Sequence, residues 1–182
     1  MSRISAPALD QTPAATRPLL DAVRKELGVV PNLVRILGSS PVALGGYLAL
    51  GGALAKGSVG AKTGERIALA IAEINGCGYC LAAHAYLARN VARLDEAEIA
   101  ANRNGGSNDP KADAAVRFAA SIARARGHVS DAAIRDVRNA GWSDAEVVEI
   151  VAHVALNTLT NYVNEVAQTE IDFPAVDPRR AA

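Results

Sequence analysis

"TGERIALAIAEINGCGYCLAAHAYLARN" (residues 63–90) joins an apolar segment to the only two cysteines of the chain. Between Ile67 and Ile74 apolar residues fall on nearly every face of a helix, rather than on one stripe. A helix of that kind is buried on all sides, so we expect residues 63–76 to form the central helix of the fold. The pair Asn75-Gly76 then breaks this helix, and a second helix is expected over residues 77–90.

The composition predicts an all-α protein. Apolar residues make up 50% of the 182 residues, but aromatic residues only 4%. Alanine and leucine, which favour helices, are frequent, whereas residues that favour strands are thinly spread. Strands and helices do not alternate anywhere in the pattern, which argues against a thioredoxin fold. The length suits one domain, which we assign to residues 15–175, between a flexible N-terminal arm (1–14) and a C-terminal tail (176–182).

Periodicity and capping residues predict the other helices. Ser40 is a suitable N-cap before Pro41, and Ser143 with Glu146 has the spacing of a capping box. The further helices are expected at residues 13–28, 30–38, 39–57, 95–102, 111–127, 131–141 and 142–167.

Charge and hydropathy limit the classes of partner. Lys and Arg number 19 and so do Asp and Glu, so no global field attracts nucleic acid or an anionic membrane. The longest uncharged run, residues 38–55, is diluted by Gly and Ser and contains a proline, which indicates a closely packed helix inside a soluble protein rather than a membrane span. The first ten residues lack the apolar core of a secretory signal. We therefore expect a cytoplasmic protein with no nucleic-acid or membrane partner.

The reactive residues of the chain are concentrated in one motif. Cys77, Cys80 and His84 have the spacing Cys-x-x-Cys-x-x-x-His. On a helix over residues 77–88 they lie on one face, with Cys80 and His84 one turn apart and Cys77 about 10 Å along the axis from His84. Two cysteines within one tetrapeptide cannot join distant loops, so the pair is expected to be catalytic or metal-binding.

The two cysteines are suited to different tasks. Cys80 is within reach of an imidazole that can take its proton, so it is the better candidate to attack a substrate. Cys77 lies at the start of the helix, where free backbone N–H groups also favour a thiolate, and is the better candidate to resolve the intermediate. A disulfide needs Cβ atoms closer than an undistorted i, i+3 pair allows, so the first turn must move; Gly76 and Gly78 make that movement easy.

Other polar residues are candidates to support this pair. A base that activates a thiol needs an orienting partner, and the residues alone leave Glu65 and Glu73 as equal candidates. His153, Asn157 and Asn161 form a polar line along an otherwise apolar helix. Because buried amides and imidazoles need partners, this line is interpreted as a hydrogen-bonded ladder between helices or subunits, with a catalytic role for His153 and Asn157 as the alternative.

The spacing of Glu65, Cys77, Cys80 and His84 resembles the motif of the alkylhydroperoxidase-D-like proteins, in the carboxymuconolactone decarboxylase superfamily. The stretches at residues 30–41, 67–84 and 150–174 are similar to a bacterial branch of that superfamily, so the resemblance covers most of residues 15–175. It differs at Tyr79, where the best-known members carry a histidine.

The resemblance implies an all-α helical bundle that assembles as a trimer or hexamer. It also implies an antioxidant peroxidase in which Cys80 attacks a hydroperoxide, Cys77 resolves the sulfenic acid as a disulfide, and His84 and Glu65 relay the proton. Tyr79, between the cysteines, is a further candidate for a supporting role. The expected partners are a small hydroperoxide and a thiol reductant, either a lipoyl protein or another dithiol donor. No cofactor is expected besides the Cys77–Cys80 disulfide.

Four other functions are consistent with the sequence. Two cysteines and His84 could bind zinc together with Glu65 or His153, although a chelate on one rigid helix is awkward, and we predict no metal. The motif could be vestigial in an oligomeric binding protein, or serve a disulfide oxidoreductase that does not use peroxide. A decarboxylase-like lyase is the remaining alternative, although the decarboxylases of the superfamily generally lack the cysteine pair.

Overall fold

The computed structural model describes residues 2–176, which form helices and no strand. This confirms the all-α prediction, and the described residues make a single domain. Two 3₁₀ helices, Leu9–Gln11 and Ala14–Thr16, precede the α-helices. In chain order these are α1 (Arg17–Leu27), α2 (Asn32–Leu37), α3 (Pro41–Leu54), α4 (Ala61–Ile74), α5 (Gly78–Asn90), α6 (Glu96–Arg103), α7 (Pro110–Ala125), α8 (Asp131–Asn139) and α9 (Asp144–Ala167).

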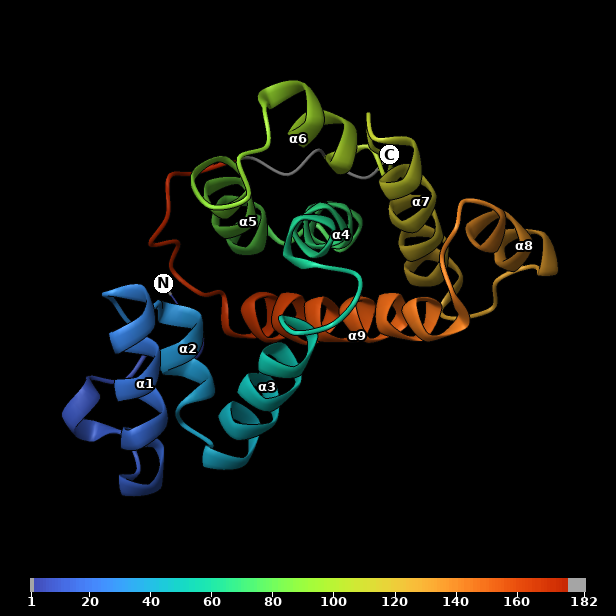
Figure 1. The fold of residues 1–182 in the computed structure, drawn as a ribbon. Coiled ribbons are helices and arrows are strands. Elements are labelled where there is room, and N and C mark those ends of the chain that lie inside the picture. The colour runs from blue at the N-terminus through green and yellow to red at the C-terminus, as the bar shows by residue number, and fades with distance from the viewer. Residues whose placement is uncertain (1, 177–182) are drawn as a thin grey trace.

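Helix α4 is the centre of the fold, as its apolar faces predict. It contacts α5, α6, α7 and α9, which surround it in Figure 1. Every side chain from Ile67 to Ala72 is at most 2% exposed. A helix without a polar face can be stable in water only when other helices cover all its sides, and this is the arrangement that the neighbours of α4 provide.

Two apolar cores lie on different faces of α4. Leu69 and Ala72 face a core built with α1, α2, α3, α5 and α6. Ile67, Ala70 and Ile71 face a second core built with α7, α8 and α9. The first core includes both cysteines, so the reactive thiols lie in the apolar interior rather than on a surface loop.

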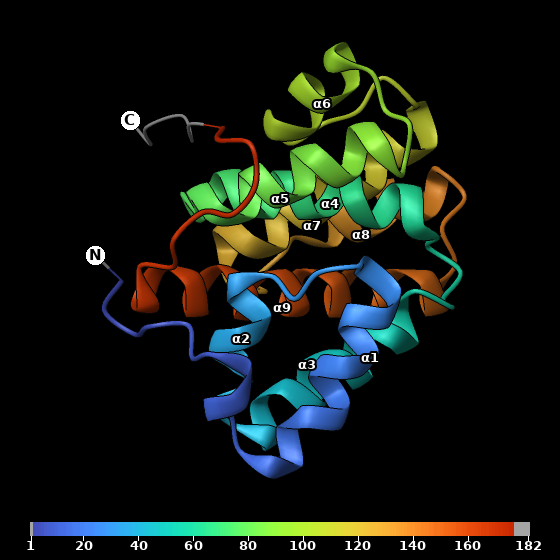
Figure 2. The same cartoon turned by 90° about the vertical axis from the view of Figure 1, so that its left-hand side faces the viewer.

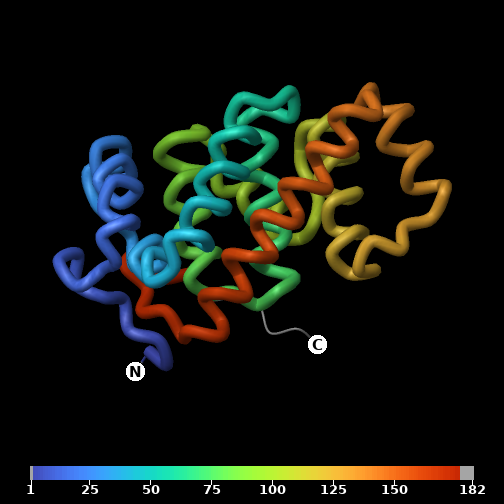
Figure 3. The backbone as a smooth tube through the Cα atoms, turned by 90° about the horizontal axis from the view of Figure 1, so that it is seen from below, coloured from blue at the N-terminus to red at the C-terminus, as the bar shows by residue number. Residues whose placement is uncertain are grey.

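Helix α9 extends along the molecule between the layer of α4, α5 and α7 and the smaller layer of α1 to α3 (Figure 2). The helices α2 and α3 pack on it toward one end and α7 toward the other, as the view from below shows (Figure 3). Ser143 and Glu146 form the predicted capping box at its start. The predicted N-cap Ser40 also accepts a hydrogen bond from the backbone of Ala43, at the start of α3.

Helix α3 differs from the expectation that it packs inside the protein. Only Leu44 and Leu54 of this helix are buried, and Val42 is 85% exposed. No charged or strongly polar side chain other than that of Tyr47 lies between Pro41 and Ala55, so half of an apolar helix faces outward. Sequence alone does not reveal this, because an apolar run looks the same whether its cover is the same chain or another.

The N-terminal arm expected over residues 1–14 makes several contacts with the helices. The guanidinium of Arg35 donates to the carbonyls of Ala6 and Pro7, and the backbone N–H of Arg3 donates to the carbonyl of Ala167. Of the C-terminal tail expected over residues 176–182, only Val176 is among the described residues, and it packs against the first core.

A buried ion pair joins α4 to α6. Arg66 Nε lies 2.7 Å from Glu98 Oε1, and both side chains are about nine-tenths buried. Glu98 also accepts from Asn102, from the hydroxyl of Ser107 and from the backbone N–H of Asn108. Burial opposes ionisation of Glu98, but these hydrogen bonds outweigh it and lower the pKa to about 2.

This pKa makes the contribution of Glu98 to stability dependent on pH. A carboxylate with a depressed pKa stabilises the folded state fully above the ordinary pKa of 4.5, and this stabilisation is lost as the pH falls toward 2. We expect Glu98→Gln to lower the free energy of unfolding at pH 7 by on the order of 3 kcal/mol, and the difference from wild type to shrink in acid. Urea unfolding at several pH values measures it.

Glu96→Gln is the matched control, because Glu96 lies on the same helix in an exposed ion pair with Arg89. Solvent screens exposed ion pairs, so they contribute little to stability, and this variant should unfold like wild type. Equal losses of stability in the two variants at pH 7 would contradict the role given to Glu98.

No helix among residues 2–176 is both long and apolar enough to cross a membrane.

Candidate active site

The turn between α4 and α5 brings the two cysteines together. Gly76 has a φ of 67°, a left-handed conformation that favours glycine, and the chain reverses there. The Cys77 N–H donates to the carbonyl of Ala72, 2.9 Å away, which ties the turn to the end of α4. The turn therefore places Cys77 directly before the first residue of α5.

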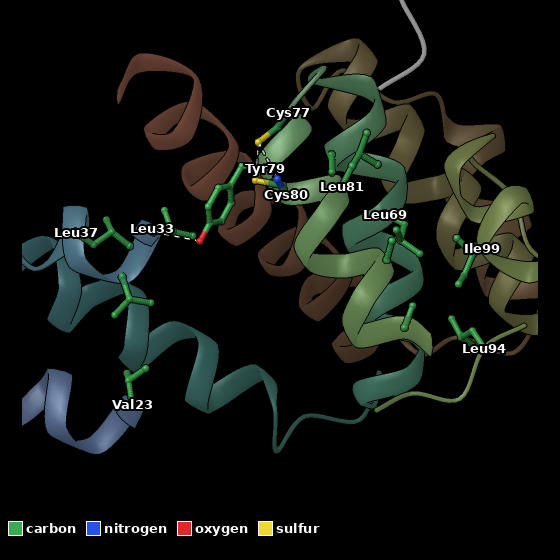
Figure 4. Close-up of a cluster of buried hydrophobic side chains, with 14 of the residues drawn as sticks. Val23, Leu33, Leu37, Leu69, Cys77, Tyr79, Cys80, Leu81, Leu94 and Ile99 are labelled. Atoms are coloured by element: carbon green, nitrogen blue, oxygen red, sulfur yellow. Dashed lines mark hydrogen bonds between the residues drawn. The ribbon is translucent and has the colours of Figure 1, made fainter. Parts of the chain in front are cut away.

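Cys77 is the N-cap of α5, not its first helical residue. Its backbone is extended, with φ −81° and ψ 98°, and its sulfur accepts from the N–H of Cys80 at 3.3 Å. In this conformation the two sulfurs lie 2.6 Å apart, and both are free thiols (Figure 4). The helix expected to begin at Cys77 therefore begins one residue later. Because an N-cap side chain folds back over the first turn, the two thiols lie close together in the undistorted helix.

Both thiols are buried, but they differ in acidity. Cys77 is fully buried and Cys80 is 2% exposed. The pKa of Cys80 is lowered to about 7, although burial alone would raise it. The largest cause is the hydrogen bond from the Cys77 thiol, and the charge of His84 and hydrogen bonds from Asn164 and Asn161 add to it. The same hydrogen bond and burial raise the pKa of Cys77. Cys80 is thus the more acidic thiol of the pair and ionises as the pH rises through about 7, while Cys77 keeps its proton.

His84 is held by Glu65, not by Glu73. His84 Nδ1 lies 2.9 Å from Glu65 Oε2, whereas Glu73 forms an ion pair with Arg103 at 2.6 Å. Burial lowers the pKa of His84, but the nearby Glu65 carboxylate and the charge of Cys80 raise it by more. His84 therefore gains a proton more readily than a free imidazole does. With Nδ1 bound to Glu65, Nε2 is the nitrogen that can exchange a proton with a bound molecule.

The interaction between His84 and Cys80 is electrostatic. Among the described residues no hydrogen bond joins the two side chains, although they are one turn apart on α5 and line the same pocket. A protonated imidazole beside a thiolate lowers the energy of both charged forms. The sequence motif therefore corresponds to a thiolate and an acid that face a common cavity.

Asn164 of α9 is a contact that the sequence analysis missed. Its Nδ2 donates to the Cys80 sulfur at 3.1 Å, while Asn161 next to it accepts from Asn75 at 2.8 Å. The signal was present, because Asn164 continues the polar line of Asn157 and Asn161 by one further turn. The polar line is thus not one continuous ladder, and its C-terminal end reaches the thiolate.

His153 and Asn157 lie behind the His84–Glu65 pair. They line a smaller cavity of about 180 Å³ that also includes Glu65 and His84. Asn157 donates to the carbonyl of His153 within α9, and no described residue pairs with the buried Nε2 of His153. Burial lowers the pKa of His153, which keeps its imidazole neutral. Gly64 permits this placement, since a Cβ there would lie 3.0 Å from the His153 ring.

Tyr79 points away from the thiols. Its hydroxyl accepts from the N–H of Leu33 at 3.2 Å (Figure 4) and also donates to Asp172 at 2.7 Å. Burial, with Asp172 beside the hydroxyl, raises its pKa, so Tyr79 remains protonated. Tyr79 therefore joins α5 to α2 and to the C-terminal segment, and makes no hydrogen bond to Cys77, Cys80 or His84 in the described structure.

A pocket of about 530 Å³ opens onto Cys80 and His84. Its volume lies within the range of about 300–1,000 Å³ that is usual for small-molecule sites. Most of its wall is apolar, and Tyr47 of α3, a residue that sequence reasoning did not single out, contributes a hydroxyl. Burial, and the charges of Cys80 and Glu65, raise the pKa of Tyr47, so it is a hydrogen-bond donor at this site.

Residues 41–120 match the model of the carboxymuconolactone decarboxylase family. The predicted family resemblance is confirmed. The matched segment contains α4 and α5, the two helices that carry Glu65, Cys77, Cys80 and His84. No curated protein matches the chain.

Several solved structures share this fold, and three of them are compared with this chain below. An uncharacterized peroxidase-related protein from Ralstonia eutropha JMP134, described as an alkylhydroperoxidase AhpD core, has a TM-score of 0.83 at 24% identity, covering 94% of this chain and 92% of its own. A peroxidase-related protein from Silicibacter sp. TM1040 has a TM-score of 0.79 at 23% identity, covering 92% of each chain. A cysteine-to-alanine variant of the debrominase Bmp8, in complex with 2,3,4-tribromopyrrole, has a TM-score of 0.78 at 18% identity, covering 94% of this chain and 92% of its own. These similarities establish an AhpD-like fold.

Removing the Asn164 amide tests whether it stabilises the Cys80 thiolate. A hydrogen bond to a charged group contributes about 1.5–3 kcal/mol, so Asn164→Leu should raise the pKa of Cys80 by about one unit. In wild type the thiolate should form as the pH rises through about 7, and in the variant at higher pH. Ultraviolet thiolate absorbance and the rate of alkylation by iodoacetamide against pH both measure this midpoint.

Asn157→Leu is the control, because Asn157 is a buried amide of the same helix that makes no hydrogen bond to sulfur. Its midpoint should match that of wild type. An unshifted midpoint in Asn164→Leu would mean that this amide does not set the acidity of Cys80.

Proposed function

We propose that this protein is a thiol peroxidase that reduces organic hydroperoxides with the Cys77–Cys80 pair. The observation that carries the proposal is the position of the Cys80 sulfur, 2.6 Å from the Cys77 sulfur. Cys80 also lines one pocket with His84, which Glu65 holds at 2.9 Å. A nucleophile, a resolving thiol and a proton donor are the groups that reduction of a peroxide requires. The match to the family model and the AhpD-like fold support an enzyme of this class.

The first step oxidises Cys80. Its thiolate attacks the terminal oxygen of the hydroperoxide, the O–O bond breaks, and the sulfur becomes a sulfenic acid. The alkoxide that leaves takes a proton from His84, which forms the alcohol product. Because the pKa of His84 is raised and that of Cys80 lowered, the proton is on the imidazole and the negative charge on sulfur before the substrate arrives.

The second step forms the disulfide. Cys77 attacks the sulfur of the Cys80 sulfenic acid, the S–O bond breaks, and the hydroxide leaves as water with the proton of the Cys77 thiol. In sum, one hydroperoxide and two thiols give one alcohol, one water and one disulfide. An external dithiol, either a lipoyl group on a protein or another donor, then supplies two electrons and two protons to restore the thiols.

The two cysteine variants test this sequence of steps. Cys80→Ser should abolish consumption of cumyl hydroperoxide, because no nucleophile remains. Cys77→Ser should allow one turnover and then hold Cys80 as a sulfenic acid that dimedone traps. Peroxide loss and thiol content measure the stoichiometry, and mass spectrometry locates the adduct.

Wild type is the positive control and should lose both thiols for each hydroperoxide consumed. Full turnover by Cys80→Ser would refute the assignment of the nucleophile. A decarboxylase-like lyase, a metal-binding protein or an oxidoreductase that acts only on disulfides would leave the hydroperoxide unconsumed.

Reductive removal of bromine from an aromatic ring is a second candidate function. It rests on the similarity of this fold to a debrominase solved with a bromopyrrole, and on the aromatic side chains in the pocket beside Cys80. In this reaction the protein would undergo the same oxidation as with a peroxide, because its two thiols become a disulfide. The ring carbon exchanges bromine for hydrogen, and the bromine leaves as bromide. Release of bromide from 2,3,4-tribromopyrrole, without consumption of cumyl hydroperoxide, would favour this candidate over the first.

We also propose that the protein assembles from copies of itself through α3 and α9, as a trimer or hexamer. The outer face of α3 carries no charged side chain between Pro41 and Ala55. The neighbouring α9 exposes an apolar stripe of Val148, Val151, Leu159, Tyr162 and Val166, which are 43–68% exposed. Contiguous apolar surface of this kind is typical of a protein interface rather than of a surface that faces water. A second copy of the chain is the partner that the family resemblance implies.

A charge placed on the outer face of α3 tests this assembly. A Cβ at Gly46 would meet no atom within 4 Å, so Gly46→Glu fits the isolated subunit and also favours the helix. We expect it to shift the mass in light scattering from that of an oligomer to that of a single chain. Ala132→Glu, at an exposed position of α8, should leave the mass unchanged. An unchanged mass in Gly46→Glu would exclude this face as the interface.

A further inference from the structure

One wall of the pocket beside Cys80 comes from the C-terminal segment rather than from the helical bundle. Asp172, Phe173 and Pro174 line the pocket together with residues of α5. This segment follows the end of α9 and has no secondary structure of its own. A pocket wall of this kind can differ between related proteins while the thiol and imidazole stay in place.

Asp172 fixes the position of this segment. One of its carboxylate oxygens accepts from the Tyr79 hydroxyl at 2.7 Å, and the other accepts from the backbone N–H of Asn32, also at 2.7 Å. The Asn32 side chain adds a bond of 3.1 Å to the carbonyl of Glu170. The segment is thus attached both to α5, two residues after Cys77, and to the start of α2.

These attachments hold the ring of Phe173 over two tyrosines of α5. Phe173 meets Tyr79 edge to face, with the ring centroids 5.8 Å apart and the planes at 88°. It meets Tyr86 at 6.0 Å and 53°. All three rings line the pocket, and Tyr86 is 42% exposed, so its ring is available to a bound molecule. Rings at these distances attract one another beyond the effect of simple burial.

Building on the proposed peroxidase, we infer that Phe173 determines specificity for hydroperoxides with an aryl group, and that Asp172 is the residue that positions it. An aryl group in the pocket adds a further ring to the cluster of Phe173 and Tyr86, while its O–O bond reaches Cys80. Hydrogen peroxide has no group that can occupy this apolar wall. The ring should therefore lower KM for an aryl substrate and leave the reaction with hydrogen peroxide unchanged.

Cumyl hydroperoxide and hydrogen peroxide separate these contributions. We expect Phe173→Ala to raise KM for cumyl hydroperoxide about tenfold, with kcat unchanged, because one aromatic contact contributes about 0.5–1.5 kcal/mol. With hydrogen peroxide both constants should equal those of wild type. Phe173→Leu, which keeps apolar bulk without the ring, should lie between the two. Asp172→Ala should raise KM for cumyl hydroperoxide as well, because it releases the segment without removing the ring.

Ile171→Ala is the matched control. Ile171 belongs to the same segment and is 41% exposed, but it does not line the pocket. It should behave like wild type with both substrates. Equal changes for both substrates in Phe173→Ala, no change for either, or the same change in Ile171→Ala would each overturn the inference.

A binding measurement distinguishes failure of this inference from failure of the proposed function. Cumyl alcohol, the product of the reaction, should bind wild type about tenfold more tightly than Phe173→Ala, since the same contact is lost. If wild type turns over no hydroperoxide, the peroxidase assignment fails, and this titration decides the role of Phe173 by itself. Equal affinities would overturn that role.

Discussion

The burial of α4 on all sides is the constraint on which the rest of the structure depends. Because no face of this helix can meet water, two separate apolar cores form, and the helix ends at the boundary of one of them. The left-handed turn at Gly76 then has to keep the next residue inside that core. Cys77 is consequently fully buried and serves as the cap of α5. The reactive pair is thus fixed by the same packing that stabilises the fold.

Burial of two thiols in contact explains why their acidities separate. Two thiolates so close together in an apolar interior would repel one another. One sulfur therefore keeps its proton and donates a hydrogen bond to the other. The direction is set by what surrounds each sulfur: the amide of Asn164 and the charge of His84 act on Cys80. Among the residues that the structure describes, only the backbone N–H of Cys80 donates to Cys77. The asymmetry required for a nucleophile and a resolving thiol therefore does not depend on exposure to solvent.

Local patterns in the sequence predicted the helices and the motif, but not the contacts made over long distances in the chain. Capping at Ser40 and Ser143 depends on residues three positions away, and it was predictable for that reason. Whether Glu65 or Glu73 contacts His84 depends on how α4 is rotated relative to α5. The residues alone do not determine this rotation. Asp172 lies 93 residues from Tyr79, in a segment whose composition resembles an irregular tail, so no local signal marks that bond.

Tyr79 illustrates how one position can change its task while the motif around it remains. Tyr79 is only 4% exposed, and a buried hydroxyl needs partners. Tyr79 finds them outside the reactive centre, in the backbone of Leu33 and the carboxylate of Asp172. A histidine at this position would be too short to reach both groups in the same way, and the C-terminal segment would lose its hydrogen bond to α5. Tyr79 therefore connects the segment that carries the thiol pair to the outer wall of the pocket.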